Sequence, residues 1–273
     1  MKRFFYSFLV VTLLPFFTKA STLDTIAVYS KSMHKNIKCV IIQPQKASNE
    51  TTRYPVIYLL HGYSGSYAQW PGLAPQLQQQ ADDFKIIFVC PDGGYGSWYV
   101  DSPVNDSIRY ETFVSKELIE FIDSRYPTIA DKPHRAITGL SMGGHGGLYL
   151  GIRHKDVYGA AGATSGGVDI RPFPNNWDLK KDLGDTICCK VNWEKNTVIN
   201  VMDNLKDGEL KLIIDCGLDD FFLEVNRNLH KKLMDRKISH DYIERPGAHN
   251  GAYWNNSIDY QVLFFHKFFM EKK

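Results

Sequence analysis

Residues 135–147 constrain the fold of this chain most, because they indicate a buried strand followed by a sharp, glycine-rich turn. The run Arg-Ala-Ile-Thr-Gly-Leu-Ser-Met-Gly-Gly (135–144) contains the pattern Gly-x-Ser-x-Gly, with Ser141 at its centre. In such an elbow the serine hydroxyl leaves the sheet on a strained turn, and the next backbone N–H is free to bind an oxyanion. We expect Gly139 and Gly143 to approach each other across the turn, where a Cβ atom would clash. The run therefore predicts a nucleophilic serine at the end of a strand.

Short apolar strands alternate with amphipathic helices along the chain. The predicted strands are 39–42, 55–60, 85–90, 135–138, 159–164, 211–215 and 240–244, and the predicted helices are 111–125, 222–236 and 258–270. This alternation is typical of an α/β fold with a mostly parallel central sheet and helices on both faces. Residues 167–208 interrupt the pattern and hold Trp177 and Trp193. We expect them to form a cap-like insertion over the site.

The N-terminus has the three parts of a secretory signal peptide. Lys2 and Arg3 precede a nearly unbroken apolar run over 4–17, and small residues lead to Ala20. We expect cleavage after residue 20, which leaves one α/β-hydrolase domain over 21–273 and a secreted or periplasmic protein. The competing interpretation is a membrane anchor, but the apolar run is short for a membrane span.

Charge and cysteine content exclude several classes of partner. The chain has 32 basic and 30 acidic residues. Loss of the three basic residues in 1–20 leaves 29 against 30, which gives no electrostatic case for nucleic acid or an anionic membrane. The five cysteines lack the spacing of a zinc site, and their odd number argues against a disulfide framework. The adjacent Cys188 and Cys189 could still form a disulfide after export. We expect no metal or cofactor.

A serine nucleophile needs a base, and the base needs a carboxylate to orient it. In α/β-hydrolases the chain order is Ser, then Asp or Glu, then His. The apolar run 211–214 leads to Asp219 and Asp220, whereas Asp215 falls within the predicted strand and is the weaker candidate. An aspartate before Phe222 would also suit a helix N-cap, so one of the pair caps and the other orients the histidine.

The predicted base is His249, which follows the last strand within the run Pro-Gly-Ala-His-Asn-Gly (246–251). Its rival is His145, but an imidazole one turn into the elbow helix is poorly aimed at the serine. The oxyanion hole needs two donors, for which we expect the N–H groups of Met142 and Tyr63. Tyr63 follows His61-Gly62 at the end of a buried strand. We expect His61 to have a structural role.

Several motifs together resemble the putative esterase family, which includes feruloyl and acetyl-xylan esterases, S-formylglutathione hydrolase and the antigen 85 mycolyltransferases. They are Leu59-Leu60-His61-Gly62, Pro91-Asp92-Gly93-Gly94 with Ser97-Trp98-Tyr99, the elbow at 139–144, Asp215-Cys216-Gly217 followed by Asp220, and Pro246-Gly247-x-His249 with Trp254. The resemblance spans nearly all of the mature chain. It implies that Ser141, Asp220 and His249 form a catalytic triad, with oxyanion donors at Tyr63 and Met142.

The resemblance and the expected export together indicate a serine carboxylesterase that removes feruloyl or acetyl groups from carbohydrates. Its substrate would be a small-molecule or oligosaccharide ester. The alternatives are an acyltransferase with the same triad, an S-formylglutathione hydrolase-like thioesterase, and a non-catalytic glycan-binding relative. The predicted substrate-binding aromatics are Trp98, Tyr99, Trp177 and Trp254, with Trp193 as a further member of a possible platform.

Overall fold

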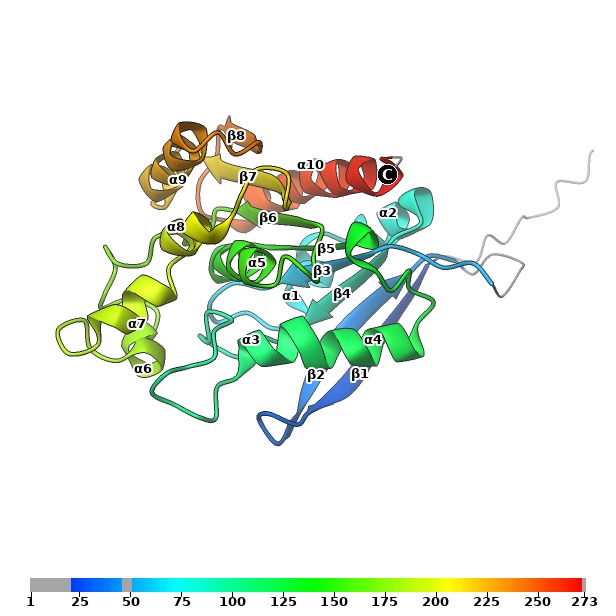
Figure 1. Ribbon diagram of the computed structural model, residues 1–273. Coiled ribbons are helices and arrows are strands. Elements are labelled where there is room, and N and C mark those ends of the chain that lie inside the picture. Colours follow the sequence, from blue (N-terminus) through cyan, green and yellow to red (C-terminus); the bar gives the residue numbers. More distant parts are fainter. Residues whose placement is uncertain (1–20, 46–50, 272–273) are drawn as a thin grey trace, which may run out of the picture.

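An eight-stranded sheet forms the centre of the protein in a computed structural model that describes residues 21–45 and 51–271 (Figure 1). Its strands are β1 (Thr22–Ser30), β2 (Lys35–Gln43), β3 (Val56–Leu60), β4 (Ile87–Pro91), β5 (Arg135–Gly139), β6 (Ala160–Thr164), β7 (Lys211–Gly217) and β8 (Asp241–Arg245). Their order across the sheet is β1-β2-β4-β3-β5-β6-β7-β8. The pairs β1–β2 and β2–β4 are antiparallel and the other pairs are parallel, which confirms the predicted, mostly parallel sheet.

Burial on both faces explains why the central strands are almost entirely apolar. In β3 the side chains of Ile57 and Leu59 enter one apolar cluster, while those of Val56, Tyr58 and Leu60 enter the other. Because successive side chains of a strand point to opposite faces, a strand between two helical layers has no position left for a solvated residue.

Helices cover both faces of the sheet, as predicted (Figure 1). One layer contains α1 (Gln69–Leu73), α2 (Leu77–Phe84) and α10 (Gly251–Met270). The opposite layer contains α3 (Tyr110–Thr112), a π-helical turn (Phe113–Glu117), α4 (Leu118–Arg125), α5 (Met142–Arg153) and α9 (Leu223–Asp235).

Several elements differ from the sequence-based prediction, which lacked α1 and α2 and began β2 at residue 39 instead of Lys35. Strand β1 was not predicted, because most of its side chains are exposed at the edge of the sheet. Helix α10 begins at Gly251 rather than at residue 258, because the side chain of Asn250 caps it by accepting the Tyr253 N–H at 3.1 Å. The helix predicted over 111–125 contains the π-helical turn.

Residues 167–208, the predicted insertion, carry α6 (Leu179–Leu183), α7 (Lys190–Lys195) and α8 (Val198–Val201). Figure 1 shows α6 and α7 at one end of the molecule, beyond the amino-terminal end of α5. The residues of the predicted signal peptide lie outside the described part of the chain. None of the helices in 21–45 and 51–271 is both long and apolar enough to cross a bilayer.

Candidate active site

Ser141 occupies a strained turn between β5 and α5. Its backbone φ of 56° lies in the region that favours glycine, and its N–H donates to the carbonyl of Thr164 at 3.0 Å. The glycines around it have the steric role expected from the sequence. A Cβ on Gly139 would lie 2.5 Å from the carbonyl oxygen of Gly143, and a Cβ on Gly143 would lie 2.2 Å from that of Leu60. Only glycine therefore lets α5 begin this close to the sheet.

His249 lies on the loop between β8 and α10, and its Nε2 atom is 2.9 Å from the Oγ atom of Ser141. Parallel strands end at the same edge of the sheet, so the loops after β5, β7 and β8 meet there. Close backbone packing joins two of these loops: the N–H of Asp219 donates to the carbonyl of Gly247 at 2.9 Å. A Cβ on Gly217 would lie only 2.3 Å from that same carbonyl oxygen. This contact brings the carboxylate loop and the histidine loop together.

Asp220, not Asp219, is the carboxylate that faces the histidine. Its two oxygens lie 3.0 and 2.9 Å from Nδ1 of His249, and its Oδ1 also accepts the Phe222 N–H at 2.8 Å. Burial acts to raise the pKa of Asp220, but the hydrogen bonds from His249 and Phe222 outweigh it, so the pKa lies below its usual value. Asp220 thus orients the histidine, but the prediction that one of the two aspartates is the helix N-cap was wrong, because the N-cap of α9 is Phe222 and no side chain caps it.

The two rival residues have other surroundings. Asp215 is fully buried in the sheet, where Thr164, Ser257 and Gln261 donate to it, and burial raises its pKa. The ring nitrogens of His145 face the backbone carbonyls of Trp98 and Asn196, at 2.9 and 2.8 Å. Burial lowers the pKa of His145 to about 4, so both rivals are part of the core rather than of the site.

The turn after β3 lies beside Ser141. A Cβ on Gly62 would lie 3.5 Å from the Cβ of Ser141, and Tyr63 is the next residue of the turn. Within residues 21–45 and 51–271, the backbone N–H groups of Tyr63 and Met142 have no hydrogen-bond acceptor. His61 holds this turn: its Nδ1 donates to the carbonyl of Gly62, and its Nε2 accepts the Gly93 N–H, both at 2.7 Å. Two backbone N–H groups without an acceptor, those of Tyr63 and Met142, therefore belong to the segments next to the Ser141 hydroxyl.

The predicted substrate-binding aromatics divide into buried and accessible side chains. Trp98, Tyr99 and Trp193 are at most 2% exposed, so the prediction that they face a ligand was wrong. They pack in the core because glycines leave room for them: a Cβ on Gly146 would lie 2.5 Å from the ring of Tyr99. Trp177 is only partly buried. Trp254, also partly buried, meets the ring of His249 edge-on, with ring centres 5.0 Å apart.

Phe221 was missed by the sequence analysis. Its side chain is 52% exposed, its ring centre lies 4.2 Å from that of His249, and it stacks on Trp177 at 5.8 Å. A large apolar residue directly after the carboxylate was the available signal. The exposed Phe221 and the partly buried Trp177 together form an aromatic wall, in which Phe221 contacts the imidazole.

Comparison with known proteins identifies the family. Residues 30–265 match the family described as “Putative esterase”. The chain belongs to this esterase family. It is 27% identical to the acetyl esterase of Caldicellulosiruptor saccharolyticus over 249 residues, which cover 84% of this chain and 92% of that protein.

Solved structures agree with this assignment. A ferulic acid esterase superposes on this esterase with a TM-score of 0.79 and 26% identity, covering 92% of this chain and 99% of the other. The serine hydrolase FphF of Staphylococcus aureus has a TM-score of 0.80 at 19% identity, over 91% and 99% of the two chains, and shows the shared fold alone. The protein is thus a serine carboxylic ester hydrolase with an α/β-hydrolase fold.

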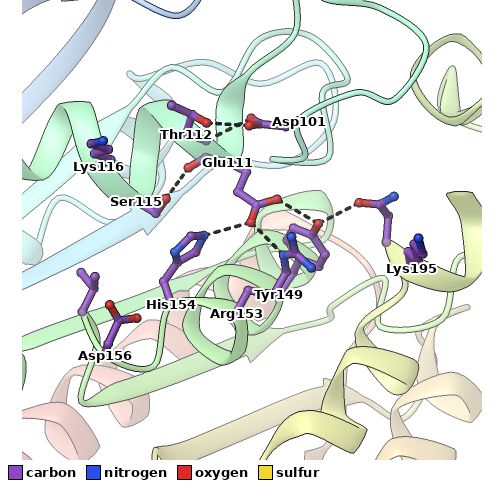
Figure 2. A pocket seen from close by; sticks show the side chains of 12 residues that line it. Asp101, Glu111, Thr112, Ser115, Lys116, Tyr149, Arg153, His154, Asp156 and Lys195 are labelled. Carbon is purple, nitrogen blue, oxygen red and sulfur yellow. Dashed lines mark hydrogen bonds and ion pairs between the residues drawn. The ribbon is translucent and has the colours of Figure 1, made fainter.

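A second polar cluster of the esterase lies away from Ser141, at the other end of α5 (Figure 2). The carboxylate of Glu111 faces a cavity of about 500 Å³ and accepts hydrogen bonds from Tyr149, Arg153 and His154 at 3.0, 2.7 and 2.9 Å. Burial acts to raise the pKa of Glu111, but the hydrogen bonds from His154 and Arg153 lower it below its usual value. These contacts tie α5 to the segment that precedes α4. Neither this cluster nor any other group of three or more His, Cys, Asp or Glu within residues 21–45 and 51–271 is arranged to hold a metal ion.

Proposed function

We propose that Ser141, His249 and Asp220 are the catalytic triad of this esterase, with the N–H groups of Tyr63 and Met142 as its oxyanion hole. The observation that carries the proposal is the continuous hydrogen-bonded line from Asp220 through His249 to the Ser141 hydroxyl, in which each step is 2.9–3.0 Å. The serine hydroxyl, the oriented imidazole and the unpaired donors are the parts that acyl transfer requires.

In the proposed reaction the Oγ atom of Ser141 attacks the ester carbonyl carbon while its proton passes to Nε2 of His249. The carbonyl oxygen becomes an oxyanion and accepts hydrogen bonds from the two backbone N–H groups. His249 then donates the proton to the departing alcohol oxygen as the carbon–oxygen bond breaks. Water attacks the resulting acyl-enzyme by the same route and releases the acid and free Ser141. Asp220 stays ionised and stabilises the imidazolium.

We further propose that the natural substrates are acetyl or feruloyl esters of carbohydrates, and that the protein is exported. An acetyl esterase and a ferulic acid esterase among the similar proteins support the acyl groups. The wall formed by Phe221 and Trp177 offers a flat apolar surface beside the imidazole. The three-part N-terminus supports export. Amino-terminal sequencing of the exported protein is expected to begin at Ser21.

Replacement of the nucleophile tests the triad. Ser141→Ala is expected to lower kcat on p-nitrophenyl acetate by about three orders of magnitude or more. Ser124→Ala, a change at an exposed serine of α4, is the matched control and should retain full activity. Activity of Ser141→Ala near that of the wild type would refute the triad. Hydrolysis of acetylated xylan and methyl ferulate by the wild type would then define the acyl group.

A further inference from the structure

A second cavity, of about 330 Å³, lies next to the proposed oxyanion loop. Tyr95 and Asp178 line it, and both touch Tyr63. The ring centres of Tyr95 and Tyr63 are 4.9 Å apart, and the Tyr63 hydroxyl donates to Asp178 at 2.9 Å. Tyr63 follows Gly62, whose Cβ position would lie 3.5 Å from the Cβ of Ser141, so this residue links the lining of the cavity to the turn beside the nucleophile.

Asp182 gives the cavity a specific polar character. The residue is only 3% exposed, yet its carboxylate has no hydrogen-bond or ion-pair partner in residues 21–45 and 51–271. Lys181, the neighbouring residue in the chain, is already paired with Asp178 at 2.9 Å. A buried carboxylate without a partner is costly, and it is satisfied by ligand groups that donate hydrogen bonds. Hydroxyl groups are such donors.

The mouth of the cavity supplies a flat surface. Tyr95 is 64% exposed, and it stands on a loop whose neighbouring residues, Gly94 and Gly96, carry no side chain. The C–H face of a sugar ring packs on an exposed aromatic ring, while the hydroxyls at its edge point to polar groups. A phenolic acyl group would bring one hydroxyl, whereas a sugar brings several to a cavity lined by two carboxylates, those of Asp178 and Asp182.

We propose that this cavity binds the sugar ring of an acylated carbohydrate, with sugar hydroxyls donating to Asp182 and the ring packed on Tyr95. This inference rests on the function proposed above, because it places the alcohol part of the ester there while its carbonyl carbon is at Ser141. Ester substrates that lack a sugar cannot use the cavity. The contribution of the cavity is thus measured by comparing kcat/KM for two substrates with the same acyl group, one with a sugar and one without.

The test compares an acetylated xylo-oligosaccharide with p-nitrophenyl acetate. Asp182→Ala and Tyr95→Ala are each expected to lower the ratio of kcat/KM for the oligosaccharide to kcat/KM for p-nitrophenyl acetate, by about tenfold for Asp182. Tyr95 is exposed, so its variant tests the cavity even if Asp182→Ala folds poorly. Asp185→Ala is the matched control, because Asp185 is an exposed carboxylate of the same insertion, and it should leave the ratio unchanged.

Two results would overturn the sugar site. One is an unchanged substrate ratio in both variants. The other is an equal loss on methyl ferulate, which would show that the cavity binds the phenolic acyl group instead. Failure of the triad itself is distinguished from both, since it would appear as full activity of Ser141→Ala.

Discussion

Asp220 holds His249 with both of its carboxylate oxygens, which lie 3.0 and 2.9 Å from Nδ1. The Phe222 N–H fixes one of the same oxygens from the other side at 2.8 Å. The orientation of the imidazole is thus set by a side chain that the start of α9 immobilises.

Asp220→Asn is therefore expected to lower kcat on p-nitrophenyl acetate by about three to four orders of magnitude, because an amide can leave the imidazole in the wrong tautomer. The comparison is Asp219→Asn, at the adjacent exposed carboxylate, which should change kcat less than twofold. Equal effects of the two substitutions would show that the line from Asp220 to Ser141 does not operate in catalysis.

Phe221 packs on the imidazole from the solvent side, with ring centres 4.2 Å apart. Phe221→Ala should let the ring of His249 move and lower kcat by about fivefold to tenfold on p-nitrophenyl acetate, since small displacements of catalytic groups are costly. Leu218→Ala, at an exposed apolar residue of the same loop, is the control. A raised KM with unchanged kcat would instead assign Phe221 to substrate binding alone.

Gly143 cannot accept a side chain, because its Cβ would lie 2.2 Å from the carbonyl oxygen of Leu60 and 2.6 Å from that of His61. We expect Gly143→Ala to lower the free energy of unfolding by about 2 kcal/mol or more, as measured by urea titration. Gly72 in α1 has nothing within 4 Å of its Cβ position. Gly72→Ala should be neutral or slightly stabilising, by up to about 1 kcal/mol. A Gly143→Ala protein as stable as the wild type would contradict the elbow geometry.

Asp182 predicts a pH dependence of stability. Burial raises its pKa from 3.8 to about 7, with a further contribution from the charge of Asp178, while Lys181 acts in the opposite direction. The folded protein then binds a proton that the unfolded chain has lost, so its stability should fall as the pH rises from about 4 to about 7 and stay level above that range. Asp182→Asn removes this loss. Its advantage over the wild type in urea titrations should grow across the same range, to a few kcal/mol, since one pKa unit is about 1.4 kcal/mol. An advantage that is constant with pH would show that Asp182 is not buried in solution.

The parts of the site that follow parallel strands could be predicted from sequence, because strand ends meet at one edge of the sheet. The chain order of Ser141, Asp220 and His249 therefore sufficed to predict a site that the fold brings together. Which of Asp219 and Asp220 faces the histidine depends on a backbone contact with Gly247, and no local pattern encodes that contact.

Which side chains are exposed at the site could not be predicted from the sequence. Trp98 and Tyr99 follow a glycine-rich turn, but Gly146 on α5 and Gly167 leave space that buries them. Phe221 and Asp182 belong to no sequence motif. Phe221 was recognised only by its contact with His249, and Asp182 only by its place in the lining of the second cavity. A strand such as β1, exposed on most of its length, lacks the apolar run by which the other strands are recognised.

Tyr63 joins the turn after β3 to residues 167–208. Its main chain offers an N–H beside Ser141, while its phenol is bonded to Asp178 in the insertion. Any displacement of that insertion must therefore pull on a residue whose amide would polarise the carbonyl. Exchanging residues 167–208 between relatives should consequently alter turnover as well as selectivity, and engineering of this segment calls for the tyrosine and its aspartate to be transferred together.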